Sequence, residues 1–530
     1  MKYPTVHALF ADRVTKYAAE RTVFYVRRDD RWHGISWRHF EQETRDFATA
    51  LLSLGLKHGG SVCILMGNVP EWPMSDIGTI SAGGVAVGLY PTSSAEQIAY
   101  VINHSDAEFV LVDSRAQLQK VLSVRDQLLK VHHIIALGAA PDGVISYQQF
   151  IERGRSERTR FAPLLKELEQ SARPDDIAIM VYTSGTTGQP KGACLSHRYI
   201  INSVESLHQT IPIYDTDVSF SYLPFCHVAE RISGLYNRLY AGAPVYFVDD
   251  LTRLGEYMLE VKPTVFASLP RFFEKIYAEH ARSKSTELKD YFGGRIRLAT
   301  SGGAPLPLEV AEFFAAAGLP ILQAYGLTEN VCVAFNRPDN YKFGTVGPPM
   351  PGCEVRIADD KEILVRSEMM FSGYYKAPEE TAKMFRDGWL LTGDLGELDD
   401  DGFLKIIGRK KELIVTSTGK KVAPALLENM LKEHHLISQA MVYGEGRSYL
   451  VALLTLNGAA ERQAVQDIVD RVNRRVSSTE SIKRFAILDR DFEIARDEIT
   501  PTGKLKRDVI VNRFRDVIEN LYSATDERRS

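Results

Sequence analysis

Short apolar runs alternate with amphipathic segments along the first third of the chain. The runs Val62–Met66, Val85–Leu89 and Phe109–Asp113 are typical of buried strands. The segment 70–82, which begins with a proline, and the segment 94–103 are predicted to be helices. Strands that alternate with helices predict βαβ units and a largely parallel sheet.

The same alternation resumes after Pro174. A strand is predicted at Ile177–Tyr182, followed by a loop rich in glycine and hydroxyl residues and then by a helix capped by Ser196. Further strands are predicted at 245–248, 264–267, 297–300 and 321–324, with a helix at 308–317. Loops that follow such strands lie at the carboxyl edge of the sheet, where open α/β sheets bind ligands.

The composition changes after about Phe343. Residues 344–408 are dense in glycine, proline and aspartate, which predicts a small β-rich subdomain. The charged run Gly408–Glu412 indicates a linker, and the segment after it is long enough for a further domain. We therefore expect an α/β fold with a large N-terminal domain over 1–408, a hinge over 409–412 and a small α+β C-terminal domain over 413–530.

Composition and charge narrow the class of protein. The 530 residues include 64 Lys+Arg and 68 Asp+Glu, a formal net charge of −4, which argues against a nucleic-acid binder. The 5 cysteines form no C-x-x-C pair, which favours a reducing compartment over a disulfide framework or a thiolate zinc site. Asp12 and Arg13 interrupt the N-terminal segment, so we expect no signal peptide. We expect a cytoplasmic protein, and peripheral contact with the inner membrane face stays open.

The loop after the strand Ile177–Tyr182 carries the first candidate chemistry. It reads TSGTTGQPKG, in which backbone N–H groups and four hydroxyls can converge on an anion and Lys191 adds a cation. A loop of this composition is more often a solvated turn. Its spacing also departs from G-x-x-x-x-G-K-[ST], which disfavours an ordinary P-loop nucleotidase.

The complete string YTSGTTGQPKGACLSH, Tyr182–His197, resembles the signature of the AMP-forming acyl-activating enzymes, which include acyl-CoA synthetases, peptide-synthetase adenylation domains and luciferases. The resemblance implies that this loop binds the phosphates of ATP. The residues concerned are Thr183, Ser184, Gly185, Thr186, Thr187, Gly188 and Lys191.

Further motifs of that family follow in order. LPFCHVAER, residues 223–231, resembles the segment with the gating histidine near the acyl carboxylate, here His227. SGGAPL resembles the loop that contacts adenine, which implies roles for Gly302, Gly303 and Ala304. A lone histidine or a strand-to-helix turn is ordinarily structural, so these assignments depend on the neighbouring residues.

QAYGLTE, residues 323–329, resembles the motif in which tyrosine stacks on adenine, threonine meets the α-phosphate and glutamate holds Mg²⁺. These positions are Tyr325, Thr328 and Glu329. A carboxylate is the hard oxygen ligand that Mg²⁺ prefers. By the same resemblance, Asp394 and Arg409 bind the ribose.

The C-terminal region carries three further matches to the family. Lys411 falls on the hinge position, and Gly419 matches the glycine beside the pantetheine arm of CoA. TPTGKLKR, residues 500–507, resembles the loop with the catalytic lysine of adenylation, which is Lys504 by position. Lys410, Lys506 and Arg507 are expected to be solvated surface charges.

Several stretches resemble the long-chain fatty acyl-CoA synthetases, including KPTVFASLPRFFEKIYAEH at 262–280 and IIGRKKELIVTSTGKKVAP at 406–424. This implies ATP- and Mg²⁺-dependent activation of a medium- or long-chain fatty acid to acyl-AMP, then transfer to CoA by a mobile C-terminal domain. The protein lacks an insertion that the long-chain synthetases usually have after Ala278. The length of the acyl chain therefore stays open. Other hypotheses are a ligase that loads a carrier protein or activates an aryl or polyketide-type acid, a non-catalytic acyl-AMP or fatty-acid binder, and an uptake or scaffold role at membranes.

Overall fold

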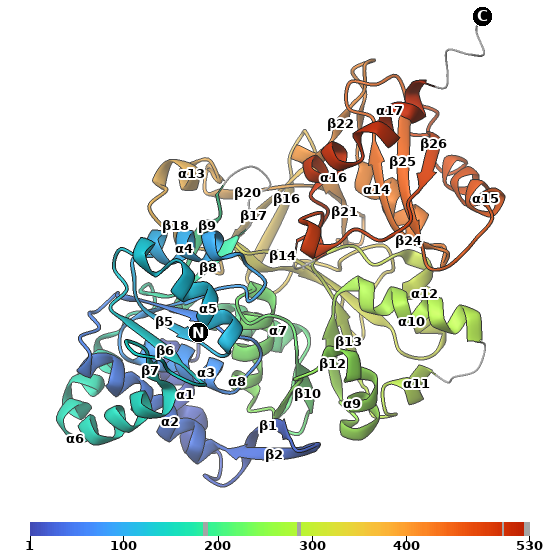
Figure 1. Cartoon of the computed structure of the whole chain (residues 1–530). Coiled ribbons are helices and arrows are strands. Elements are labelled where there is room, and N and C mark those ends of the chain that lie inside the picture. Colours follow the sequence, from blue (N-terminus) through green and yellow to red (C-terminus); the bar gives the residue numbers. More distant parts are fainter. Residues whose placement is uncertain (184–188, 284–287, 501–502, 524–530) are drawn as a thin grey trace, which may run out of the picture.

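The computed structural model describes residues 1–183, 189–283, 288–500 and 503–523 (Figure 1). The predicted parallel sheet is its largest, with eight strands in the order β18-β9-β8-β4-β3-β5-β6-β7. These strands are β3 (Ser61–Leu65), β4 (Val85–Gly88), β5 (Ala107–Val112), β6 (His133–Ala136), β7 (Ile145–Ser146), β8 (Ile177–Thr183), β9 (Lys191–Ser196) and β18 (Gly373–Tyr374). Six of them, from β8 to β7, are parallel, whereas β9 and β18 at the other edge are antiparallel.

Helices cover both faces of this sheet. Val62 and Ile64 of β3 face a core shared with α2 (Trp37–Ser53), α3 (Glu71–Ser81) and α6 (Tyr147–Ser171). The alternate residues Cys63 and Leu65 face a second core with α4 (Ala95–His104) and α5 (Arg115–Ser123). Burial on both faces explains why each strand is a continuous apolar run.

One predicted loop is instead a strand. The helix α7 (His197–Thr210) begins as expected, with Ser196 accepting a hydrogen bond from the backbone N–H of Tyr199. However, the residues before it form β9, which pairs with β8 from Thr183↔Lys191 to Ile177↔Ser196. Its stability comes from pairing with β8 rather than from its own composition, which is rich in small and polar residues.

Two four-stranded sheets complete the N-terminal part of the molecule together with the large sheet. One has the order β10-β11-β1-β2, with β1 (Thr22–Arg28), β2 (Arg31–Ser36), β10 (Ser219–Ser221) and β11 (Val245–Phe247). The other has the order β12-β13-β14-β15, with β12 (Val265–Ser268), β13 (Leu298–Ser301), β14 (Ile321–Leu327) and β15 (Asn330–Phe335). The helices of this region include α1 (Val6–Lys16), η2 (Ala229–Tyr236), α8 (Asn237–Ala241), α9 (Leu254–Val261), α10 (Pro270–Ser283), α11 (Leu288–Tyr291) and α12 (Leu308–Ala316).

The predicted β-rich subdomain is a five-stranded antiparallel sheet. Its strands are β16 (Cys353–Ile357), β17 (Glu362–Ser367), β19 (Phe385–Arg386), β20 (Trp389–Leu398) and β21 (Leu404–Arg409). The helix α13 (Pro378–Ala382) comes just before β19 in the sequence. The segment that the composition marked as β-rich thus forms this sheet, with β17 near its middle.

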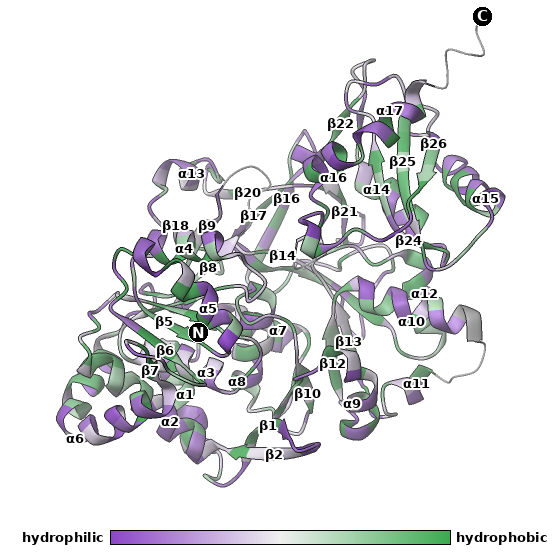
Figure 2. Cartoon of the chain, viewed as in Figure 1, coloured by the Kyte–Doolittle hydropathy of each residue, from purple (hydrophilic) through white to green (hydrophobic). Residues whose placement is uncertain are grey.

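The C-terminal part forms a separate body with its own core (Figure 1). A three-stranded sheet of β24 (Ile437–Tyr443), β25 (Leu450–Leu456) and β26 (Ile482–Ile487) packs with α14 (Pro424–Lys432) and α15 (Arg462–Asn473). A hairpin of β22 (Ile414–Val415) and β23 (Lys421–Val422) precedes them, and α16 (Arg507–Arg513) and α17 (Arg515–Ser523) follow. Figure 2 shows hydrophobic strands in this sheet and a largely hydrophilic α15 outside it. The predicted fold class is confirmed.

Within the described ranges, no helix has the length and apolar character needed to cross a membrane.

Candidate functional site

The hairpin between β14 and β15 presents the motif residues 325–329. Tyr325 belongs to β14, whereas Thr328 and Glu329 form the turn before β15. A Cβ atom on Gly326 would lie 2.0 Å from the carbonyl oxygen of Val331, so only glycine fits this turn without displacing the backbone. The hydroxyl of Tyr199 donates to the carbonyl of Thr328 over 3.0 Å and fixes the turn from α7.

Glu329 is buried, with 8% of its surface exposed, beside two side chains from β9 and β18. The hydroxyl of Tyr374 donates to Oε1 of Glu329, and Lys191 lies 5.3 Å from the centre of the Tyr374 ring. Lys191 is also paired with Glu380. Burial and the charge of Glu329 raise the pKa of Tyr374, which therefore stays a proton donor.

Glu329 suits a single protein ligand to Mg²⁺. Tyr374 occupies Oε1, and among the described residues no hydrogen bond is made to Oε2. The described part of the chain has no cluster of three His, Cys, Asp or Glu side chains that could cage a metal. Mg²⁺ is commonly held by one or two carboxylates together with substrate phosphates and water, so this residue set fits the ion only alongside a nucleotide.

Tyr325, Asp394 and Arg409 form one hydrogen-bonded group. The hydroxyl of Tyr325 donates to Oδ2 of Asp394 over 2.7 Å, and Nε of Arg409 lies 3.0 Å from Oδ1. Asp394 and Arg409 face each other on the paired strands β20 and β21, and only 4% of Asp394 is exposed. Burial, and then the charge of Asp394, raise the pKa of Tyr325. The predicted adenine and ribose residues therefore lie together.

The loop Gly302–Ala304 leaves the end of β13 beside the same strand, β14. Ser301 is paired in register with Gln323, whose side-chain oxygen accepts a hydrogen bond from the backbone N–H of Leu306 over 3.0 Å. Gly303 has a φ of +82°, in the left-handed region that favours glycine. The loop is accessible and follows the backbone next to Tyr325, as expected for a surface that receives a planar base.

Lys504 reaches this site from the C-terminal body. Its backbone closes a turn in which the N–H of Thr500 donates to the carbonyl of Lys504 over 2.8 Å. Burial, and then the charge of Arg409, lower the pKa of Lys504, whereas Asp394, Glu412 and Glu329 act in the opposite direction. The side chain therefore lies among these four charged groups.

His227 lies in the turn that leads into the π-helix η2, close enough to Lys504 to be affected by its charge. Its Nδ1 accepts a hydrogen bond from the backbone N–H of Ala229 over 3.2 Å, which places the proton of the neutral ring on Nε2. Burial, and then the charge of Lys504, lower the pKa of His227 to about 4. The ring is therefore neutral at physiological pH.

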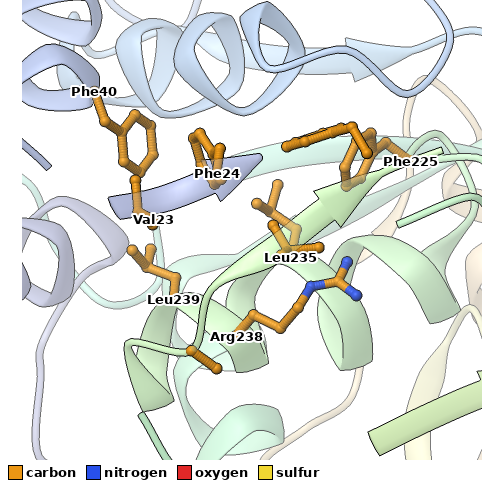
Figure 3. A pocket seen from close by; sticks show the side chains of 10 residues that line it. Val23, Phe24, Phe40, Phe225, Leu235, Arg238 and Leu239 are labelled. Atoms are coloured by element: carbon orange, nitrogen blue, oxygen red, sulfur yellow. The ribbon is translucent and has the colours of Figure 1, made fainter. Parts of the chain in front are cut away.

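An apolar cavity is lined by Phe225, two residues before His227. Phe225 stacks on Trp72 with ring centres 4.9 Å apart and lines a narrow cavity between β1, β11 and the helices α2, η2 and α8 (Figure 3). The cavity is lined by Val23, Phe24, Phe40, Phe225, Leu235, Arg238, Leu239, Ala243, Val245 and Phe247.

Comparison with known proteins agrees with this geometry. A family model for the AMP-binding enzyme matches residues 10–375, and one for the AMP-binding enzyme C-terminal domain matches residues 411–526. The chain belongs to the AMP-binding enzyme family. The long-chain-fatty-acid–CoA ligase FadD15 of Mycobacterium bovis is 34% identical over 93% of both chains. The long-chain-fatty-acid–CoA ligase ACSBG1 of Rattus norvegicus is 30% identical over 98% of this chain and 85% of that one.

Solved structures share the fold of this AMP-binding enzyme. The anthranilate CoA ligase AuaEII, in complex with anthranoyl-AMP, superposes with a TM-score of 0.83 at 22% identity and covers 98% of each chain. The A-PCP didomain of carboxylic acid reductase from Segniliparus rugosus, in complex with AMP, gives 0.80 at 23% identity over 99% of this chain and 82% of that one.

Not all of the predicted site residues of this AMP-binding enzyme are brought to the Glu329–Asp394 region by the described structure. Gly419 occupies the turn between β22 and β23 with a φ of +76°, and no described contact joins it to the site. Thr183 ends β8 opposite Lys191, at the base of the glycine-rich loop. The loop residues Ser184, Gly185, Thr186, Thr187 and Gly188 lie outside the described residues.

The three residues expected to be solvated surface charges all have partners. Lys506 is paired with Asp497. Arg507 donates to both carboxylate oxygens of Glu428, over 2.8 and 2.7 Å, and lies 3.6 Å from Glu412. Lys410 lies 2.6 Å from Asp360 and 2.8 Å from Glu362. Lys410 stays exposed, as expected, although it is paired. The expectation of a solvated surface charge was wrong for Arg507, because most of its side chain is buried against a partner from a segment distant in sequence.

Tyr374 is the site residue that sequence reasoning missed. It lies 45 residues after Glu329 and reaches it only because β18 adds to the edge of the large sheet. No local pattern in the sequence marks it.

Proposed function

We propose that this protein is an ATP-dependent ligase that activates a medium- or long-chain fatty acid to acyl-AMP and then transfers the acyl group to CoA. The observation that carries the proposal is the grouping of Tyr325, Asp394 and Arg409 beside the hairpin that bears Glu329. The effect of these charges on Lys504 agrees with it. The similarity to two long-chain fatty acid–CoA ligases over most of the chain supports the choice of acid.

The first step must bring two anions together. A fatty carboxylate is a poor acylating agent, because expelling oxide is unfavourable. Its oxygen attacks the α-phosphorus of ATP, the bond to the β-phosphate oxygen breaks, and pyrophosphate leaves. Lys504 would bridge the carboxylate and the α-phosphate, and these anions favour its charged form against the local lowering of its pKa.

The nucleotide would be oriented by the residues already grouped. Tyr325 would stack on adenine against the Gly302–Ala304 loop, while Asp394 and Arg409 would hold the ribose. Thr328 would meet the α-phosphate, and Lys191 with the glycine-rich loop would bind the outer phosphates. Mg²⁺, held by Glu329, would supply charge neutralisation for the departing pyrophosphate.

His227 would receive the acyl carboxylate. Because its ring is neutral with the proton on Nε2, it can donate a hydrogen bond to a carboxylate oxygen. The alkyl chain would continue toward the apolar cavity lined by Phe225. In the second step the CoA thiolate attacks the acyl carbon and AMP leaves. We propose that the C-terminal body turns about Lys411 between the steps and brings the Gly419 turn to the site.

A pyrophosphate-release assay tests the proposal across fatty acids from butyrate to stearate and a set of aromatic acids. We expect release with medium- or long-chain acids, formation of acyl-CoA only when CoA is added, and loss of both products with EDTA. Absence of AMP with every acid would contradict the proposal. Preference for aromatic acids, or acyl transfer to a holo carrier protein in place of CoA, would favour the alternative ligase.

A further inference from the structure

An arginine on α10 crosses from the N-terminal part to the C-terminal body. Nη1 of Arg271 donates to the backbone carbonyl of Ser438 over 2.9 Å, and Nη2 donates to the Ser438 hydroxyl over 2.7 Å. Nη2 also donates to Oδ2 of Asp491 over 3.0 Å. Ser438 lies on β24 and Asp491 follows β26, so one guanidinium binds two segments of the other body.

The acceptor for Arg271 is held in place by its own body. The Ser438 hydroxyl also lies 2.6 and 2.8 Å from the two oxygens of Asp491, and the Thr455 hydroxyl donates to Asp491 as well. These neighbours fix the carboxylate before Arg271 arrives. A planar guanidinium that meets a preorganised acceptor loses little freedom on binding.

Other charges across this boundary are arranged more loosely. Glu274, one helical turn after Arg271, lies 3.6 Å from Lys432 of α14. Glu309 of α12 lies 3.8 Å from Arg471 of α15, and the Arg471 side chain is 55% exposed. An exposed pair at that separation contributes little. Among the described residues, the contacts of Arg271 are therefore shorter than these two ion pairs between the N-terminal part and the C-terminal body.

In this same orientation of the C-terminal body, the charges of Asp394 and Glu329 act on Lys504. We infer that Arg271 is a positioning residue, a latch that stabilises the adenylating orientation and must release before acyl transfer to CoA. This inference rests on the proposed function. A turn of the C-terminal body about Lys411 would separate Arg271 from Ser438 and Asp491, because the two partners move with that body.

Measurement of the two half-reactions tests the latch. Arg271→Ala should slow acyl-AMP formation at least tenfold and leave acyl-CoA formation from pre-made acyl-AMP within twofold of the unchanged protein. Arg471→Ala, which removes an arginine from the same boundary, should change neither by more than twofold. Asp491→Asn, which keeps the shape of the acceptor, should reproduce part of the Arg271→Ala effect. Equal loss in both half-reactions, or no loss in either, would overturn the inference.

Zero-length carbodiimide cross-linking gives a readout that needs no activity. The amide between Lys432 and Glu274 should form across the boundary, because their charged atoms are 3.6 Å apart. Its yield, relative to the Lys410–Asp360 cross-link whose partners are 2.6 Å apart, should fall at least threefold in Arg271→Ala and in the milder Arg271→Lys. An unchanged ratio in both variants would overturn the latch. Failure of the unchanged protein to form acyl-AMP would instead count against the proposed function, while the cross-link ratio would still test the latch.

Discussion

At the scale of single residues, the site is organised by the way each charge is partnered. Each oxygen of Asp394 has one described partner, Tyr325 or Arg409, and can still accept a further hydrogen bond. Glu329 has one described partner, and no described residue binds its Oε2. Lys504 faces these groups without a described ion pair of its own, and its pKa is lowered. We therefore propose Lys504 as the cation that meets the anionic substrates.

Removal of this cation should affect one half-reaction. Lys504→Ala should slow acyl-AMP formation. We expect the transition state to lose about 2.7–4 kcal/mol of stabilisation, as when an enzyme loses one hydrogen-bond donor to an oxyanion. Acyl-CoA formation from pre-made acyl-AMP should be spared, because the proposal gives that step to the other orientation of the C-terminal body. Rapid-quench measurement of both steps checks this. Lys506→Ala, two residues away and paired with Asp497, is the matched control, and equal loss in both half-reactions would rule out the role given to Lys504.

At the scale of elements, the sequence predicts what is encoded locally. The strands β3, β4 and β5 are recognisable because both of their faces are buried, and the cap at Ser196 is recognisable because its hydroxyl begins α7. The strand β9 is not, because it depends on β8 for its hydrogen bonds. Motif resemblance locates Tyr325, Asp394 and Lys504, but Tyr374 and the partners of Arg507 come from distant segments that only the tertiary fold brings near.

The π-helix η2 depends on a buried charge from another element. Arg231 of η2 is paired with Asp76 of α3, both side chains are fully buried, and Arg231 also donates to the carbonyl of Ala86 over 3.1 Å. Asp76 further accepts a hydrogen bond from Tyr236 at the end of η2. This network attaches the helix that follows His227 to the large sheet.

Loss of Asp76 should therefore be severe. Asp76→Ala leaves the Arg231 charge buried without its partner, at a cost of about 3–5 kcal/mol in the free energy of unfolding. Asp175→Ala, which removes the exposed partner of Arg198 at 2.7 Å, should cost less than about 1 kcal/mol. Urea unfolding followed by circular dichroism compares the two variants. Similar midpoints for both would show that the buried pair contributes no more than a surface pair.

At the scale of the whole molecule, the two bodies meet where the chemistry is proposed. The N-terminal part contributes Glu329, Asp394 and the surface for the nucleotide, and the C-terminal body contributes Lys504. The contacts of Arg271 with Ser438 and Asp491 stabilise this meeting, while Gly419 lies outside it. We therefore propose that this orientation of the bodies serves acyl-AMP formation and that the transfer to CoA uses another.

The central claim is that the fatty carboxylate itself attacks the α-phosphate of ATP. Turnover of a fatty acid labelled with ¹⁸O in both carboxylate oxygens, with ATP, Mg²⁺ and CoA, tests it by mass spectrometry of the AMP. We predict one ¹⁸O atom in each AMP, because the carboxylate oxygen that bonds to phosphorus stays there when the thiolate breaks the acyl C–O bond. Unlabelled AMP formed together with acyl-CoA, or formation of ADP in place of AMP, would contradict the account.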